Sequence, residues 1–215
     1  RTNLDLKVVW GLTDMTKKAM VQRAIQCISG LTLPKIRTSP DLLSKDDNES
    51  RDYAMQVLLD IGQRLTFVEA PVTSNRIKST VISTGAKICV IDYLQRMMPD
   101  VIEEGSNKTA HMDHCLGGLL QLSQQQDCSV IMISSTPKRI DPKTRIMDCF
   151  RDTGGAAFDA DIIYFGENNE DSKSAEVAGC KTVTWHCEKH REGITHISAN
   201  FDGSVMRYVD GITYE

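Results

Sequence analysis

The sequence has 215 residues, a formal net charge of −4 at pH 7, 40% hydrophobic residues and 25% charged residues. These values are ordinary for a soluble globular protein. The negative net charge excludes a surface that attracts nucleic acid over its whole area, so such a contact needs a local basic segment. The seven cysteines form no C-x-x-C pair, which favours free thiols in a reducing compartment over a disulfide framework.

No apolar stretch is long enough to cross a membrane, and no signal-peptide pattern opens the chain. We therefore expect a cytoplasmic protein without a membrane partner.

The first half of the chain alternates predicted strands with predicted helices. Short apolar runs predict strands, and apolar residues at helical spacing predict helices. The strands are expected at 7–12, 65–70 and 88–92, and the helices at 16–30, 49–64 and 74–84, with a polar loop over 31–50. For the helix at 49–64 we expect the buried stripe Tyr53, Val57, Leu58 and Ile61. The alternation of strand and helix favours a parallel sheet with helices on its faces.

The second half predicts one long helix and then mostly strands. The helix is expected over 106–126, followed by a buried strand at 129–134, a basic loop at 136–151 and an acidic loop at 167–176. Further strands are expected at 161–165, 182–187, 195–201 and 205–209, the last three as a terminal meander. The expected fold class is α/β, with a mostly parallel central sheet flanked by helices and a C-terminal antiparallel meander. One domain is expected over residues 1–215.

The apolar run Ile88 to Ile91 stops abruptly at Asp92. A strand without a polar face belongs in the middle of a parallel sheet. The carboxyl ends of such strands are where open α/β sheets bind ligands. In nucleotide hydrolases a carboxylate at this place holds Mg²⁺ or its water shell. Because many α/β proteins carry an aspartate here without such a role, a purely structural Asp92 stays open.

The predicted loop at 136–151 carries a local excess of positive charge. A net positive loop suits phosphate contacts, although a solvated surface loop is the plainer interpretation. Aromatic residues are scarce there, so base stacking is not expected. Its charged residues are Lys138, Arg139, Lys143, Arg145 and Arg151 against Asp141 and Asp148.

Two groups of histidine and cysteine residues raise the possibility of a metal site. One group falls at helical spacing and the other near a predicted strand, but neither shows a second ligand pair. A zinc site is therefore a minor alternative. The groups are His111, His114 and Cys115, and His186, Cys187 and His190.

Four stretches stand in a fixed order along the chain: DMT…VQR over residues 14–23, IDYLQ over 91–95, FRDTG…DAD over 150–161 and EKHREG…FDG over 188–203. In this order and spacing they resemble the ATPase domain of DnaB-type replicative helicases, which has a RecA-like fold. IDYLQ is similar to that family's Walker B segment, and the other three resemble its EMS…VQR, LRESG…DAD and KNRNG…FDG stretches. The resemblance covers nearly the whole chain.

The resemblance implies roles for residues at the matching positions. Asp92 would be the Walker B carboxylate that holds Mg²⁺ through water. Asp14 takes the place of the catalytic glutamate, although it is one methylene shorter, and a helix-entry aspartate remains the alternative. Lys189 and Arg191 match a pair that reaches the nucleotide site of the neighbouring subunit.

The resemblance also implies a single-strand contact. Lys138, Arg139, Arg151, Asp152 and Gly154 fall on or near the stretch that lines the ring's central pore in that family. Ser135 stands where the family usually carries a glutamine that links nucleotide state to this loop.

One departure is an absence: the sequence contains no G-x-x-x-x-G-K-[ST] phosphate-binding loop. In the family this loop lies just upstream of the strand that residues 7–12 resemble. The simplest interpretation is that the chain begins after it.

The implied function is the motor domain of a hexameric helicase, an enzyme using ATP and Mg²⁺. It would translocate on single-stranded DNA, unwind duplexes, and assemble as a homo-hexamer with a primase or helicase loader as possible partners. The alternative is a non-catalytic RecA-like module for DNA binding or ring assembly. A RecA-like ATPase with another task is a third hypothesis, disfavoured by the IDYLQ-like and K-x-R-like segments.

Overall fold

The computed structural model describes residues 5–101, 107–135, 159–168, 180–190 and 196–214. The chain forms two compact units. The first comprises Arg1–Lys17 with Leu59–Asp159, and the second comprises Lys18–Leu58 with Ala160–Glu215. Among the described residues, no helix is both long and apolar enough to cross a membrane.

The first unit is built on a four-stranded parallel sheet in the order β2-β1-β3-β4. Its strands pair in register, so their last residues meet at one edge of the sheet. The sheet thus gathers the carboxyl ends of neighbouring strands, as expected for an α/β protein. The strands are β1 (Val8–Leu12), β2 (Leu65–Glu69), β3 (Ile88–Asp92) and β4 (Ser129–Ile133).

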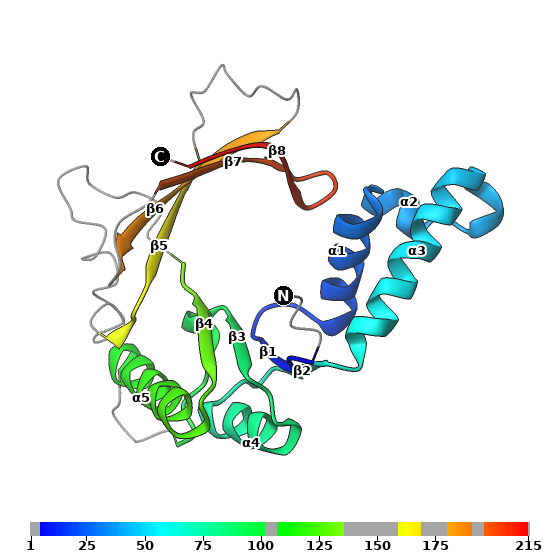
Figure 1. Ribbon diagram of the computed structural model, residues 1–215. Coiled ribbons are helices and arrows are strands. Elements are labelled where there is room, and N and C mark those ends of the chain that lie inside the picture. Colours follow the sequence, from blue (N-terminus) through cyan, green and yellow to red (C-terminus); the bar gives the residue numbers. More distant parts are fainter. Residues whose placement is uncertain (1–4, 102–106, 136–158, 169–179, 191–195, 215) are drawn as a thin grey trace. The chain divides into compact units, whose positions relative to one another are not determined.

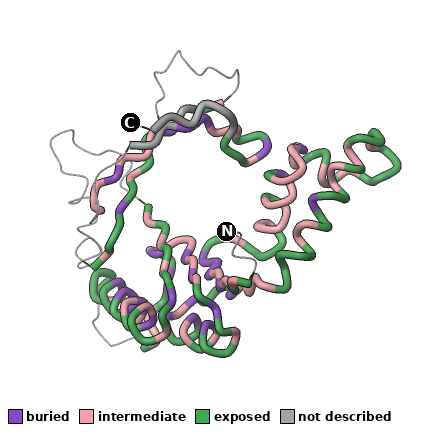
Figure 2. Tube along the Cα trace, in the orientation of Figure 1, coloured by how far each residue is buried: buried purple, intermediate pink, exposed green. Residues whose placement is uncertain are grey.

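Helices α4 (Ser74–Thr84) and α5 (Lys108–Gln126) cover one face of this sheet (Figure 1). Alternate strand residues point toward these helices because successive side chains of a strand face opposite sides. The resulting core holds most of the fully buried residues of this unit, as Figure 2 shows for the strands and the inner sides of the helices. It includes Val9, Cys89 and Ile91 from the strands, Ile77 and Val81 from α4, and Met112, Leu116, Leu119 and Leu122 from α5.

The prediction that residues 129–134 form a strand buried on both faces was wrong. Val130 and Met132 pack against the core, but Ile131 is 53% exposed and Ile133 is 45% exposed. The strand alternates because α4 and α5 cover only the face toward which Val130 and Met132 point.

Two glycines fix how the helices of this unit end and pack. Gly85 ends α4 in the left-handed conformation, with φ 68°, and its amide donates to the carbonyl of Val81, as is typical of a glycine that caps a helix C-terminus. Gly118 brings α5 close to α4, since a Cβ there would lie 2.5 Å from the Cβ of Ser74. The absence of a side chain at Gly118 therefore sets the distance between the two helices.

The second unit contains α1 (Lys17–Ser29), whose first residue belongs to the first unit, and α3 (Lys45–Gly62), whose last residues from Leu59 belong to the first unit. The expected loop over 31–50 was wrong in part, because it contains α2 (Leu33–Arg37), the short η1 (Pro40–Leu42) and the first turn of α3. Each short helix has a proline at one of its first two positions, Pro34 in α2 and Pro40 in η1. Proline is favoured there because its missing amide proton is not needed for a helical hydrogen bond.

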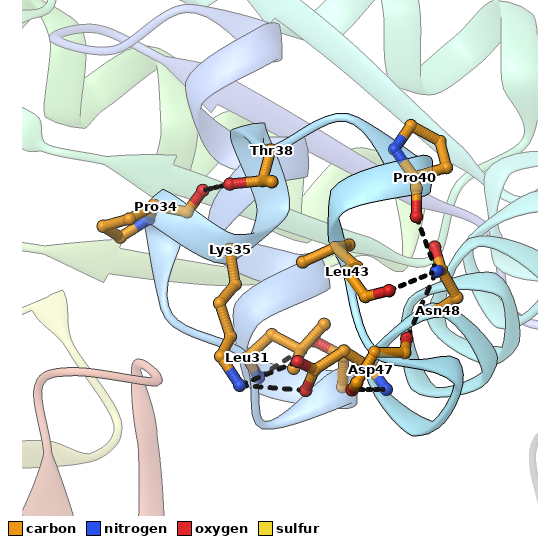
Figure 3. Close-up of polar contacts among 10 residues, drawn as sticks. Leu31, Pro34, Lys35, Thr38, Pro40, Leu43, Asp47 and Asn48 are labelled. Carbon is orange, nitrogen blue, oxygen red and sulfur yellow. Dashed lines mark hydrogen bonds and ion pairs between the residues drawn. The ribbon is translucent and has the colours of Figure 1, made fainter.

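Polar contacts tie α2 and its loop to α3, as Figure 3 shows. Lys35 Nζ pairs with Asp47 at 2.8 Å, and Asn48 Nδ2 donates to the carbonyl of Pro40 at 2.8 Å. The predicted stripe of α3 was wrong at Tyr53 and Ile61, which are 65% and 36% exposed. Val57 and Leu58 are half-buried, and Ala54 is fully buried.

The second unit also contains an antiparallel sheet in the order β5-β6-β7-β8, the predicted meander with one strand added. The turn before β8 contacts the end of α1: Gln26 Nε2 donates to Ser204 O at 3.0 Å, and the Arg207 guanidinium lies against Gly30. The strands are β5 (Ile163–Asn168), β6 (Lys181–Lys189), β7 (His196–Asp202) and β8 (Arg207–Tyr214).

Candidate functional site

The carboxyl ends of β1 and β3 are joined by Thr13. Its amide donates to the carbonyl of Asp92 at 2.9 Å, and its hydroxyl oxygen accepts from the amide of Tyr93 at 2.8 Å. The same hydroxyl donates toward the carbonyl oxygens of Asp92 and Tyr93, which lie 2.9 and 3.0 Å from the Thr13 oxygen. Thr13 is only 7% exposed, so these bonds are shielded from water. The residue after Thr13, Asp14, is thereby held at the same sheet edge as Asp92.

Asp14 is exposed and pairs with Arg96, at 3.3 Å from Oδ1 to the guanidinium. Arg96 comes from the short η2 (Leu94–Arg96), which directly follows Tyr93. Its Nε donates to the Tyr93 hydroxyl at 3.0 Å. The hydrogen bond with Tyr93, and then the charge of Asp14, raise the pKa of Arg96 above its ordinary value. A fixed cation therefore accompanies the carboxylate that the resemblance assigns to catalysis.

Asp92 is the last residue of β3 and is half-buried. In register it lies beside Leu12 of β1 and Ile133 of β4, so it sits at the middle of the carboxyl edge. The predicted position of Asp92 is confirmed. Its role as a metal ligand stays a prediction.

A third connection at this edge runs from η2 to the end of β4. Gln95 Nε2 donates to the Ser134 hydroxyl at 2.7 Å and to the Ser135 carbonyl at 3.0 Å. In return, the Ser135 amide donates to Gln95 Oε1 at 3.1 Å. The side-chain amide of Gln95 thus satisfies both backbone groups of Ser135.

Glu69, at the end of β2, lies at the start of α1. Its carboxylate accepts a hydrogen bond from the Lys17 amide at 2.8 Å, as favoured for a negative group near a helix N-terminus. The ammonium of Lys17 lies 5.8 Å from the centre of the Phe67 ring. These contacts fix where the chain leaves Asp14 and enters α1.

Of the remaining predicted site residues, the structure describes Lys189 alone. Lys189 ends β6 in the second unit, where its partner in the sheet register is Ile163. Arg191 and the predicted DNA contacts Lys138, Arg139, Arg151, Asp152 and Gly154 lie outside the described residues.

The zinc alternative gains no support from the geometry. Among the residues that the structure describes, no three histidine, cysteine, aspartate or glutamate side chains gather closely enough to hold a metal ion. His114 instead lies 3.7 Å from Asp100, and Cys115 is fully buried. Burial, followed by the charge of Asp100, raises the pKa of the Cys115 thiol to about 11.

The donor set at the sheet edge fits part of a magnesium–nucleotide site. Mg²⁺ in such sites is bound through one or two carboxylates together with the substrate phosphates. Asp14 and Asp92 provide carboxylates at neighbouring strand ends. The sequence contains no glycine-rich loop with a lysine to receive the phosphates.

Sequence reasoning missed Thr13, Glu69 and Arg96 and gave Gln95 no role of its own. Thr13 and Glu69 had a usable signal, since each is a polar residue at or just after the end of a strand. Gln95 belongs to the IDYLQ stretch, but that stretch did not reveal its partners. Arg96 had no usable signal, because Asp14 lies far away in the sequence.

Comparison with known proteins places these features in a family. The family model described as "DnaB-like helicase C terminal domain" matches residues 2–210. A probable plasmid replicative DNA helicase of Chlamydia muridarum is 23% identical over 175 residues, covering 76% of this chain and 37% of that protein. The corresponding protein of Chlamydia trachomatis serovar L2 is 23% identical over 207 residues, covering 91% and 42%. The chain thus spans about two fifths of the length of these relatives.

Solved structures show the same fold. The ATPase domain of G40P matches with a TM-score of 0.80 and 22% identity, over 96% of this chain and 75% of that one. A DnaB-like replicative helicase, solved with its interactions with primase, matches with a TM-score of 0.79 and 24% identity, over 95% and 52%. The α/β fold is therefore that of RecA-like ATPase domains, as the sequence predicted. By the family match over nearly its whole length, the chain belongs to the DnaB-like helicase C-terminal domain family.

Proposed function

We propose that this chain is the motor part of a replicative DNA helicase, which couples nucleoside triphosphate hydrolysis to movement along single-stranded DNA. The observation that carries the proposal is the Thr13 junction. It places Asp14 and Asp92 on one edge of the parallel sheet, where α/β proteins bind their ligands. Family membership supports helicase activity in general.

In this proposal each carboxylate has its own task. Asp92 holds the water shell of Mg²⁺, and Asp14 orients the water that attacks the γ-phosphate. The magnesium–nucleotide complex supplies the reactive phosphoryl group and neutralises its charge. Glu69 fixes the start of α1 and so limits the movement of Asp14.

Lys189 and Arg191 are proposed to act on a nucleotide bound by the neighbouring copy. A guanidinium that reaches a phosphoryl group from another subunit stabilises the charge of the transition state. The proposal therefore requires a ring, for which we propose a homo-hexamer. The basic residues of 136–154 would contact the strand, chiefly through its phosphates. Primase or a loader is proposed as a further partner, since one structural relative was solved with primase interactions.

The alternative function is a non-catalytic module that keeps ring assembly and DNA binding. One observation favours it: Asp14 is paired with Arg96, which offsets its negative charge.

A subunit-mixing experiment on the full-length protein tests the motor proposal. Asp92→Asn should inactivate the site in its own subunit, and Arg191→Ala should inactivate the neighbouring site. Each variant alone should hydrolyse ATP poorly, whereas a mixture should recover a measurable fraction, because some interfaces then join an intact Asp92 with an intact Arg191. If mixed rings form but ATP hydrolysis is not recovered, the proposal that each active site is shared between two subunits is contradicted. Rings and strand binding without hydrolysis in the wild type would favour the non-catalytic module.

A further inference from the structure

Two adjacent side chains of η2 connect different strand ends. Arg96 pairs with Asp14 after β1, while Gln95 bonds Ser134 and Ser135 after β4. Tyr93, the residue before η2, is itself held by Thr13 and by Arg96. The backbone of η2 therefore joins the candidate hydrolysis carboxylate to the end of β4 through one short series of contacts.

The resemblance places a glutamine at position 135 in related helicases, whereas this chain has Ser135. Serine has a short hydroxyl side chain and no amide, so it cannot make the contacts of a glutamine side chain. Gln95, from a different element, contacts this position with its own side-chain amide, through three hydrogen bonds of 2.7 to 3.1 Å to the Ser134 hydroxyl and to both backbone groups of Ser135. Such paired contacts fix the direction in which the chain leaves β4.

We propose that η2 is a coupling element: Arg96 positions Asp14, Gln95 positions Ser135, and the turn transmits a displacement of one to the other. The inference rests on the proposed function for its biological meaning, because residue 135 directly precedes the stretch assigned to strand contacts. Arg96 and Gln95 are positioning residues and contact no reacting atom in this scheme. Coupling of this kind is carried by contiguous contacts between elements.

The ion pair between Asp14 and Arg96 is the weaker of the two η2 contacts, and it limits how strongly the two strand ends can be coupled. Asp14 and Arg96 side chains are 51% and 57% exposed, so their ion pair is screened by solvent. An exposed pair of this kind shifts an equilibrium by no more than about five-fold. The coupling is therefore expected to be modest and must be measured by a method that resolves small changes.

Amide hydrogen exchange at Ser135 tests the coupling without requiring hydrolysis. In Gln95→Met, which keeps the side-chain length but removes the amide, exchange at Ser135 should accelerate because its acceptor is lost. In Asp14→Asn, exchange at Ser135 should accelerate about two- to five-fold, because Arg96 is released from its partner. The control is Asp127→Asn, which removes another exposed ion pair of this unit, with Lys87, outside the η2 contacts. Unchanged exchange at Ser135 in Asp14→Asn would overturn the coupling, whether or not the protein hydrolyses ATP.

Steady-state kinetics of the full-length protein give a second, independent readout. Arg96→Met should lower kcat with little change in KM, both with and without single-stranded DNA. Arg96→Lys should restore part of kcat, since it keeps the charge. Gln95→Met should lower the ratio of strand-stimulated to basal hydrolysis about two- to five-fold, whereas Gln125→Met, which removes a contact with Lys78 on the helices, should not. Equal effects of Gln95→Met on basal and stimulated rates would contradict the coupling, while absence of hydrolysis in the wild type would count against the proposed function only.

Discussion

The hydroxyl of Thr13 accepts a hydrogen bond from the amide of Tyr93 at 2.8 Å, although 80 positions separate the two residues in the chain. The contact joins the ends of β1 and β3, the two central strands of the parallel sheet. Because the hydroxyl also donates to the carbonyls of Asp92 and Tyr93, one buried side chain from the end of β1 satisfies polar backbone groups at the end of β3. The arrangement of Asp14 and Asp92 depends on this junction.

Replacing Thr13 tests the junction directly. Thr13→Val keeps the shape but leaves the Tyr93 amide without its acceptor, which costs about 1–3 kcal/mol in the free energy of unfolding. Thr13→Ser keeps the hydroxyl and should lose much less. Urea unfolding followed by circular dichroism measures both values. Equal stabilities of the valine and serine variants would show that the hydroxyl is unimportant.

Gly118 and its neighbour Gly117 offer a matched pair on α5. A Cβ at position 118 would lie 2.6 Å from the Ser74 hydroxyl oxygen, whereas a Cβ at position 117 would meet nothing within 4 Å. Gly118→Ala should therefore force α4 and α5 apart and destabilise the unit by about 1–3 kcal/mol. Gly117→Ala should stabilise it by about 0.5–1 kcal/mol, because alanine loses less entropy in a helix. Thermal unfolding of the two variants gives opposite shifts of Tm if the close contact limits the packing.

The lowered pKa of the Asp100 carboxyl predicts that the stability of the protein depends on pH. Burial of the carboxyl raises its pKa, but four other influences lower it: hydrogen bonds from Thr73, Ser74 and the Asn75 amide, and the charge of His114. Together they outweigh the effect of burial, so the pKa of Asp100 lies below the ordinary value. A lowered folded-state pKa means that the stabilisation is present above about pH 4, the unfolded value, and is lost as the pH falls through the folded-state pKa.

The matched change for this prediction is Asp100→Asn, which keeps the shape and removes the charge. At pH 7 it should lower the free energy of unfolding by about 1 kcal/mol, because Asp100 lies at the N-terminus of α4. The difference from wild type should shrink as the pH is lowered from 5 toward 3. Urea unfolding at several pH values measures it, and a difference that stays constant over this range would contradict the assignment.

The order of strands and helices was predictable because each element carries a local signal. The run from Ile88 to Ile91 ends sharply at Asp92, and Gly85 marks the end of the preceding helix. These features depend only on neighbouring residues. The position of Asp92 at the sheet edge follows from them.

Burial was harder to predict, as Tyr53 and Ile131 show. Helical spacing indicates which residues share a side of α3, but it does not tell which side faces a neighbour, and Tyr53 lies on the exposed one. An apolar run predicts a strand covered on both faces, yet the described helices cover only the face of β4 opposite Ile131.

The contacts of the candidate site were the least predictable. Arg96 and Asp14 lie on different elements, and so do Gln95 and Ser135. Such pairs depend on the register of β1, β3 and β4, which no local pattern specifies. Resemblance to a family named Asp14 and Asp92 as candidates but did not identify Arg96, whose contact with Asp14 appears only in the structure.

ATP hydrolysis by the full-length protein, with and without single-stranded DNA, is the most direct test of the proposed motor. The wild type should hydrolyse ATP faster when the strand is present. Asp92→Asn should lose about 100-fold in kcat, because the carboxylate that holds the magnesium water shell is gone. Asp127→Asn, the control at an exposed carboxylate, should match the wild type. A wild type without strand-stimulated hydrolysis, or an Asp92→Asn variant as active as the control, would contradict the account.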